Sequence, residues 1–216
     1  MKRIWIEFFS WFVKLTGWPV QFFWFKTKVY RESEEQGCYL RGPAILVSNH
    51  RSVYDFALYL FLFPLNTVRY LMGEALFRNK LLGWFLRSLG GIRIDRSVHS
   101  VDGIERCRRI VEKGGVAGIF PEGRCPLPDE ARPLPFHEGA AVLGLSTGAK
   151  IIPVVTDGVY FQKARAHVII GHPLFAADYV REGMTEREAE KAVTAALREE
   201  IIRLEKLLDE KKQNKA

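Results

Sequence analysis

The chain has 216 residues, of which 48% are hydrophobic and 26% are charged. This length suits one domain, and the hydrophobic share is sufficient for a sizeable core, which excludes an intrinsically disordered protein. The formal net charge of +7 attracts polyanions, which here means nucleic acid or an anionic lipid surface.

The N-terminal segment, residues 1–31, mixes aromatic with basic side chains and contains one acid, Glu7. Such a mixture is typical of the lipid–water interface, where rings and cations each find a suitable depth. Single-stranded nucleic-acid binders also combine aromatics with bases, but the chain has no nucleic-acid-binding motif. We therefore predict an anionic membrane surface as a partner, and no nucleic acid. The tryptophans and phenylalanines of the segment are Trp5, Phe8, Phe9, Trp11, Phe12, Trp18, Phe22, Phe23, Trp24 and Phe25.

This segment does not have the pattern of a membrane-spanning helix, because Glu7, Lys14 and Lys26 interrupt it. A span needs about 20 mostly apolar residues. We expect one or two interfacial helices, broken near Gly17 and Pro19, that lie in the membrane plane. The alternative is that the aromatic side chains pack against the globular domain.

The cysteines are Cys38, Cys107 and Cys125, and they form no CxxC pair. An odd number of widely spaced cysteines is typical of free thiols in a reducing compartment. Together with the N-terminal segment, this predicts a peripheral or monotopic protein on the cytoplasmic face of a membrane.

The rest of the chain alternates strand-like with helix-like segments. Short apolar runs indicate buried strands, and longer amphipathic or apolar stretches indicate helices. The alternation predicts an α/β fold with a mostly parallel sheet flanked by helices. We expect an interfacial helical segment at 1–31, an α/β domain at 32–210 and a polar tail at 211–216. The expected strands are 44–48, 68–72, 92–95, 116–120, 151–155 and 167–170; the expected helices are 55–63, 79–89, 101–113, 139–146 and a long helix opened by a capping box at Thr185.

His50 and Asp55 follow the first apolar run, so they lie at the carboxyl end of an expected strand, where parallel α/β folds place their active sites. A histidine can take a proton near neutral pH, and a nearby carboxylate holds its tautomer and stabilises the imidazolium. A tight turn into a helix would join the two side chains. The alternative is a capping box of Ser52 and Asp55, with His50 as an ordinary loop residue. The two interpretations are compatible.

Two further segments contain groups suited to an anion. Glu122, Gly123 and Arg124 follow another expected strand. A glycine there lets backbone N–H groups approach a phosphate, and an arginine can bind its oxygens bidentately. Arg96 ends the second segment, 90–96, which begins with two flexible glycines. Taken alone, each segment is better explained as a plain turn or a salt-bridged strand.

Taken together, these segments resemble the glycerolipid acyltransferase family, which includes 1-acylglycerol-3-phosphate and glycerol-3-phosphate acyltransferases. The shared motifs occur in the family's order within residues 44–158. They are His-x4-Asp at a strand end, Gly-x-x-x-Ile-Asp-Arg, Phe-Pro-Glu-Gly-Arg and Lys-Ile-Ile-Pro-Val.

The resemblance implies a general base, His50, that acts on the acceptor hydroxyl with Asp55 as its partner. It assigns the acceptor's phosphate to Arg96, Glu122, Gly123 and Arg124, and the acyl-donor or acyl-chain side to Ile152, Pro153 and Val154. The implied co-substrates are acyl-CoA or acyl-carrier protein as donor and a lysolipid as acceptor, with no cofactor and no metal.

The chain departs from the family's usual pattern at two places near the expected phosphate site. Many members carry Glu-Gly-Thr-Arg where this chain has Glu-Gly-Arg-Cys, and a basic pair where it has His137 and Glu138. Lysophosphatidic acid is the expected acceptor, while glycerol 3-phosphate or another lysolipid stays open. Three competing hypotheses also stay open, namely a covalent acyl intermediate on Cys125, a hydrolase that uses the same pair, and a non-catalytic membrane-binding module.

Overall fold

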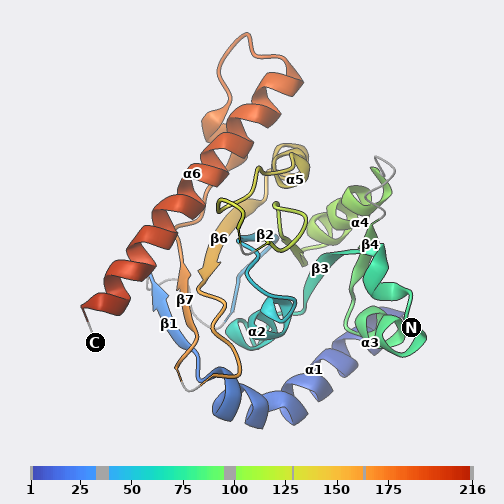
Figure 1. Cartoon of the computed structure of the whole chain (residues 1–216). Helices are drawn as coiled ribbons and strands as arrows, with labels where there is room; N and C mark the ends of the chain where they lie inside the picture. Colours follow the sequence, from blue (N-terminus) through green and yellow to red (C-terminus); the bar gives the residue numbers. More distant parts are fainter. Residues whose placement is uncertain (1, 33–38, 95–100, 128, 163, 215–216) are drawn as a thin grey trace.

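The computed structural model describes residues 2–32, 39–94, 101–127, 129–162 and 164–214. Within these ranges one seven-stranded sheet has the order β1-β7-β6-β2-β5-β3-β4 (Figure 1). The pair β6–β7 is antiparallel and the other neighbours are parallel, so the expected α/β fold with a mostly parallel sheet is confirmed. The strands are β1 (Lys28–Arg31), β2 (Ala44–Ser48), β3 (Val68–Gly73), β4 (Ile92–Ile94), β5 (Val116–Ile119), β6 (Lys150–Thr156) and β7 (His167–Ile170).

Helices of the described ranges cover both faces of this sheet (Figure 1). Helices lie in the connections between the successive strands β2, β3, β4, β5 and β6, and the longest helix follows β7. The α-helices are α1 (Lys2–Val20), α2 (Asp55–Leu62), α3 (Lys80–Ser88), α4 (Val101–Glu112), α5 (Gly139–Thr147) and α6 (Glu186–Gln213). The short elements are the π-helix η1 (Gln21–Phe25) and the 3₁₀ turns η2 (Glu74–Phe77) and η3 (Ala176–Tyr179).

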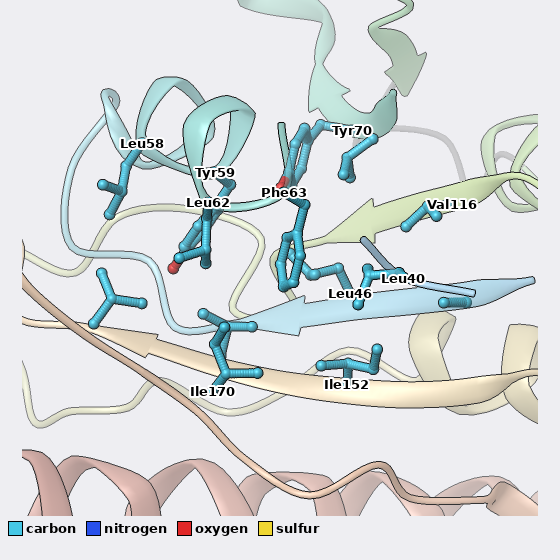
Figure 2. Close-up of a cluster of buried hydrophobic side chains, with 14 of the residues drawn as sticks. Leu40, Leu46, Leu58, Tyr59, Leu62, Phe63, Tyr70, Val116, Ile152 and Ile170 are labelled. Atoms are coloured by element: carbon cyan, nitrogen blue, oxygen red, sulfur yellow. The ribbon is translucent and has the colours of Figure 1, made fainter. Parts of the chain in front are cut away.

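The core on one side of the sheet lies under α2. Figure 2 shows Leu58, Tyr59 and Leu62 of this helix above Leu46 of β2 and Ile152 of β6. Because α2 is apolar on most of its surface, it is buried between the sheet and the N-terminal helix.

The core on the opposite side lies under α4, α5 and α6. There Ile45 and Val47 of β2 pack with residues of these helices, such as Val111, Leu143 and Leu197. Alternate residues of β2 therefore point into different cores, which explains why the strand is buried throughout and why residues 44–47 are all apolar.

The expected strands and helices are present, with small shifts at their ends. α6 begins with the expected capping box, in which Thr185 and Glu188 exchange side-chain-to-backbone hydrogen bonds. β1 lies outside the expected strands, because its sequence Lys-Val-Tyr-Arg has no apolar run. It pairs in parallel with β7 at the edge of the sheet. The domain division after residue 31 stays a prediction; β1 lies on its N-terminal side.

The expected break in the N-terminal helix is wrong. α1 continues past Gly17 and Pro19 and leads directly into η1, which ends at Lys26 in a left-handed conformation with φ 48°. Gly17 serves packing instead, since a Cβ there would lie 2.8 Å from the ring of Phe61 in α2. Pro19 lies in the last turn of α1, where the loss of one N–H bond leaves the rest of the helix intact.

One side of α1 is docked on the domain. The buried Lys14 ammonium donates to the carbonyl oxygens of Pro64 at 2.9 Å and Asn66 at 2.7 Å, in the loop between α2 and β3. Phe9 packs in a small cluster with Leu60 and Leu89. These contacts fix the rotation of α1 about its axis, and with it the side that faces away.

The other side of α1 and η1 is exposed, which argues against the alternative that the aromatic segment is buried in the domain. Phe9 and Phe25 are the buried phenylalanines of the segment. None of the helices in the described ranges combines the length and apolar character that crossing a bilayer requires. The large exposed residues of α1 and η1 are Ile4, Trp5, Phe8, Trp11, Phe12, Leu15, Trp18, Val20, Phe22, Phe23 and Trp24.

The substitution Lys14→Ala tests this docking. It removes the donor of two charged hydrogen bonds, so we expect the free energy of unfolding to fall by roughly 1–3 kcal/mol. Urea denaturation followed by circular dichroism measures the change. Lys206→Ala, at an exposed position of α6, is the control and should change stability by less than about 0.5 kcal/mol. Equal losses in the two variants would contradict the role of Lys14.

Candidate active site

The segments that follow the central strands meet at one edge of the sheet. β2 lies between β5 and β6, with Val47 in register with Ile119 on one side and Pro153 on the other. Because these strands are parallel, their carboxyl ends lie side by side. His50 after β2 and Glu122 after β5 are therefore neighbours.

A tight turn brings His50 and Asp55 together. His50 Nδ1 lies 2.8 Å from Asp55 Oδ2, which also accepts the backbone N–H groups of Arg51 at 2.8 Å and Ser52 at 2.9 Å. Asp55 is fully buried. The carboxylate places the ring proton on Nδ1, so Nε2 is the nitrogen that can take a proton. The catalytic roles of the two residues stay predictions.

The capping-box alternative for Ser52 and Asp55 is only half present: Asp55 Oδ2 accepts the N–H of Ser52, but Ser52 Oγ does not accept the N–H of Asp55 in return. α2 begins at Asp55 itself, after Tyr54, and no side chain caps the helix at Tyr54. Ser52 Oγ instead accepts the N–H of Tyr54 at 3.2 Å. The Asp55 carboxylate turns back to the loop that carries His50, so its hydrogen bonds organise that loop.

Tyr160 is a site residue that the sequence analysis missed. Its hydroxyl donates to Asp55 Oδ1 at 2.7 Å and lies 2.9 Å from Thr156 Oγ1 at the end of β6. Both carboxylate oxygens of Asp55 are thereby engaged. The one available signal was the position of a tyrosine shortly after an expected strand, which is too common a pattern to single it out.

An aromatic wall supports the imidazole. The rings of His50 and Phe120 are stacked, with centroids 4.4 Å apart and planes at 19°. Phe120 also stacks on Tyr59 and Tyr70. Gly118 makes room for this arrangement, because a Cβ there would lie 2.2 Å from the Tyr70 ring. The stack limits the orientations of the His50 ring and covers one of its faces.

Glu122 and Gly123 connect the loop after β5 to the same site. Glu122 is buried, and its carboxylate accepts the N–H of His50 at 2.8 Å and that of Leu134 at 2.9 Å. Burial raises the pKa of Glu122, although both hydrogen bonds oppose this. Gly123 has φ 73°, and a Cβ there would lie 2.9 Å from the His137 ring. The role of this segment in phosphate binding stays a prediction.

Of the two arginines predicted to bind phosphate, the structure describes Arg124. Arg124 is exposed, and its guanidinium forms a two-pronged ion pair with Glu130. A phosphate that binds here competes with that carboxylate. Arg96 lies outside the described residues. The phosphate-binding role of both stays a prediction.

Ile152, Pro153 and Val154, predicted for the acyl-donor or acyl-chain side, are buried in β6. Ile152 and Val154 belong to the core beneath α2. All three lie in register with the end of β2, directly before the His50 loop. Their role stays a prediction.

The environment of His50 determines its proton affinity. Burial lowers the pKa of the imidazole, while hydrogen bonds and charge interactions with Asp55 and Cys125 raise it. The net result is a pKa raised to about 9. The ring therefore holds a proton more firmly than an unperturbed histidine does.

The arrangement can accept a proton from a hydroxyl or from water and stabilise the resulting imidazolium. Among the residues that the structure describes, no group of three or more His, Cys, Asp or Glu side chains is arranged to hold a metal ion. The chemistry that the described side chains support is general acid–base catalysis.

Comparison with known proteins identifies the protein family to which the chain is similar. A family model described as Acyltransferase matches residues 26–157. A 1-acyl-sn-glycerol-3-phosphate acyltransferase of Bacillus subtilis (strain 168) is 30% identical over 148 residues, which cover 66% of this chain and 71% of that relative. A chloroplastic 1-acyl-sn-glycerol-3-phosphate acyltransferase of Brassica napus is 29% identical over 54% of this chain and 33% of its own length.

A solved structure has the same fold. The crystal structure of the 1-acyl-sn-glycerophosphate (LPA) acyltransferase of Thermotoga maritima aligns with a TM-score of 0.63, at 20% identity, over 93% of this chain and 79% of that one. The family match spans more than half of this chain and contains His50, Asp55 and the Glu122–Gly123–Arg124 segment. The chain therefore belongs to the acyltransferase family.

Proposed function

We propose that this enzyme transfers a fatty acyl group from acyl-CoA or acyl-carrier protein to a hydroxyl of lysophosphatidic acid, giving phosphatidic acid for phospholipid biosynthesis. The observation that carries the proposal is the hydrogen bond of 2.8 Å between His50 and the buried Asp55, at the carboxyl end of a central parallel strand. The names of the relatives from Bacillus and Brassica support the choice of acceptor.

The reaction needs one base and an oriented hydroxyl, because a thioester is already activated. His50 Nε2 takes the proton from the acceptor hydroxyl as its oxygen forms a bond to the thioester carbonyl carbon. The carbon–sulfur bond then breaks, and the leaving thiolate takes a proton back from the imidazolium. Asp55 stabilises that imidazolium without itself becoming protonated. The step requires no protein nucleophile.

The acceptor's phosphate is assigned to Arg96, Glu122, Gly123 and Arg124. Gly123 has the positive φ that brings backbone N–H groups close to an anion. Arg124 supplies a guanidinium once the phosphate displaces Glu130. Glu122 contributes by holding this segment against the His50 backbone, since its carboxylate is occupied by two N–H donors.

We also propose that α1 and η1 lie on an anionic membrane surface at its cytoplasmic face. The contacts of Lys14 and Phe9 turn the aromatic side outward. α3 extends this apolar surface with the exposed Leu81 and Trp84, and the Trp84 ring contacts Phe9 with centroids 5.5 Å apart. Exposed apolar surfaces of this kind, with nearby bases, are typical of membrane-contacting proteins.

The first prediction of this proposal concerns His50. Purified protein with vesicles, an acyl thioester and lysophosphatidic acid should release thiol and form phosphatidic acid. His50→Ala should be roughly 100-fold slower or more, because it removes the general base. His172→Ala, at an exposed position, is the matched control. Thiol release that does not depend on the acceptor would favour a hydrolase, and vesicle binding without turnover would favour a non-catalytic module.

The second prediction concerns the pH dependence. Because His50 must be neutral to act as a base, kcat/KM should rise with pH and level off above about 9, the value to which its pKa is raised. Cys125→Ala removes one of the interactions that raise this pKa, so the plateau should begin at a lower pH. Cys107→Ala, in the core on the other side of the sheet, is the control. Abolished turnover in Cys125→Ala, with a stoichiometric thiol burst in the parent protein, would establish a covalent acyl-cysteine instead.

The third prediction concerns the membrane. The double variant Phe8→Glu/Phe23→Glu replaces two exposed rings of α1 and η1, and sedimentation with anionic vesicles should show binding weakened roughly tenfold or more. Val180→Glu, an exposed apolar residue after η3, is the control for an added charge. Unchanged sedimentation of the double variant would refute the assignment of this surface.

A further inference from the structure

A glutamate of the C-terminal helix contacts the loop that carries His50. Glu205 lies in α6, yet its Oε1 accepts hydrogen bonds from Asn49 Nδ2 at 2.9 Å and from Arg51 Nη2 at 2.7 Å. Asn49 and Arg51 are the neighbours of His50 on either side. One carboxylate oxygen therefore holds the loop on both sides of the imidazole.

Asn49 extends these contacts to the end of β6. The residue is fully buried, and its carboxamide both donates to the carbonyl oxygen of Thr156 and accepts the N–H of Thr156, each at 3.0 Å. Thr156 Oγ1 lies 2.9 Å from the Tyr160 hydroxyl, which donates to Asp55. A chain of hydrogen bonds thus runs from Glu205 to the carboxylate partner of His50.

Arg51 provides a second, shorter connection. Its backbone N–H donates to Asp55, while its side chain ends at Glu205. The chain at Gly158 passes so close that a Cβ there would lie 2.4 Å from Arg51 Cβ. Arg51 Nε is buried and has no hydrogen-bond partner among the described residues. Glu205 is thus the charged partner that fixes the Arg51 side chain.

We propose that Glu205 is a positioning residue for the reaction: it holds Asn49 and Arg51 so that the His50–Asp55 pair keeps its geometry. The expected effect of Glu205 on the rate rests on the proposed function. Its effect on the His50–Asp55 hydrogen bond can be measured without substrate.

We expect an effect on turnover because proton transfer to His50 requires the imidazole to lie at the right distance from the acceptor hydroxyl. Without Glu205, the Asn49 carboxamide loses an acceptor and the Arg51 guanidinium is left without its counter-charge. A loop that relaxes to solvate these groups moves the imidazole relative to Asp55 and to the acceptor. Displacements of about 1 Å in such sites can lower rates up to roughly 100-fold.

Attachment of α6 to the sheet is the competing explanation, and Glu200 provides the matched control. Glu200 lies on the same helix, its side chain has the same exposed fraction of 16%, and it forms an ion pair with Arg203. Glu200→Ala removes an ion pair within α6 and leaves the contacts of the His50 loop in place, so it controls for the loss of a half-buried carboxylate on this helix. If Glu205 acted only by attaching α6, Glu205→Ala would lower the unfolding temperature without changing the His50–Asp55 contact or kcat.

The experiment compares Glu205→Ala, Glu205→Gln and Glu200→Ala with the parent protein, after thermal unfolding has shown that each is folded. In Glu205→Ala, kcat should fall roughly tenfold or more while the KM for lysophosphatidic acid changes little. Glu205→Gln keeps an acceptor oxygen for Asn49 but not the charge that pairs with Arg51, so it should recover part of the loss. Glu200→Ala should resemble the parent.

A second readout follows the His50 Nδ1 proton by nuclear magnetic resonance, assigned by its disappearance in His50→Gln. This proton is held by Asp55, so its resonance should weaken or move in Glu205→Ala and persist in Glu200→Ala. Identical kcat values and Nδ1 signals in Glu205→Ala and Glu200→Ala would overturn the inference. The parent protein could lack transferase activity while the Nδ1 signal is lost in Glu205→Ala alone. That result would refute the proposed function but support the positioning role of Glu205.

Discussion

The buried carboxylate of Asp55 is the group on which the site depends. Removing a charged carboxylate from water costs several kcal/mol unless hydrogen bonds replace its hydration. Here the replacement comes from the His50 ring, two backbone N–H groups and the Tyr160 hydroxyl. The loop after β2 and the segment after β6 must close around Asp55 to provide these donors. The geometry that prepares the imidazole is therefore also a condition for burying its partner.

The parts of the fold and of the site that could be predicted from the sequence are those formed by residues close together in the chain. The apolar run that became β2 and the His-x4-Asp spacing are local, so the strand, the turn and the His50–Asp55 contact could be predicted from the sequence. Tyr160 and Glu205 reach the site from positions 105 and 156 residues away from their partners Asp55 and Asn49. Side chains of common types at such distances leave no pattern in a single sequence.

In the N-terminal segment, two helix-breaking residues predicted a break that the structure does not have. Gly17 and Pro19 suggested a break, yet Gly17 allows α1 to approach Phe61, and Pro19 falls in the last helical turn. β1 was not expected, because an edge strand of four residues owes its structure to its pairing with β7 rather than to its own composition. Tertiary packing decided both cases.

The order of the elements along the chain has a consequence for synthesis. β1 leaves the ribosome long before β7, its partner in the sheet, and Glu205 of α6 follows later still. Contacts between distant segments form only when both are available. A nascent chain therefore exposes its aromatic N-terminal segment while the edge strand is unpaired and the His50 loop lacks its C-terminal contact. A lipid surface met at that stage meets the aromatic segment before β1 is paired.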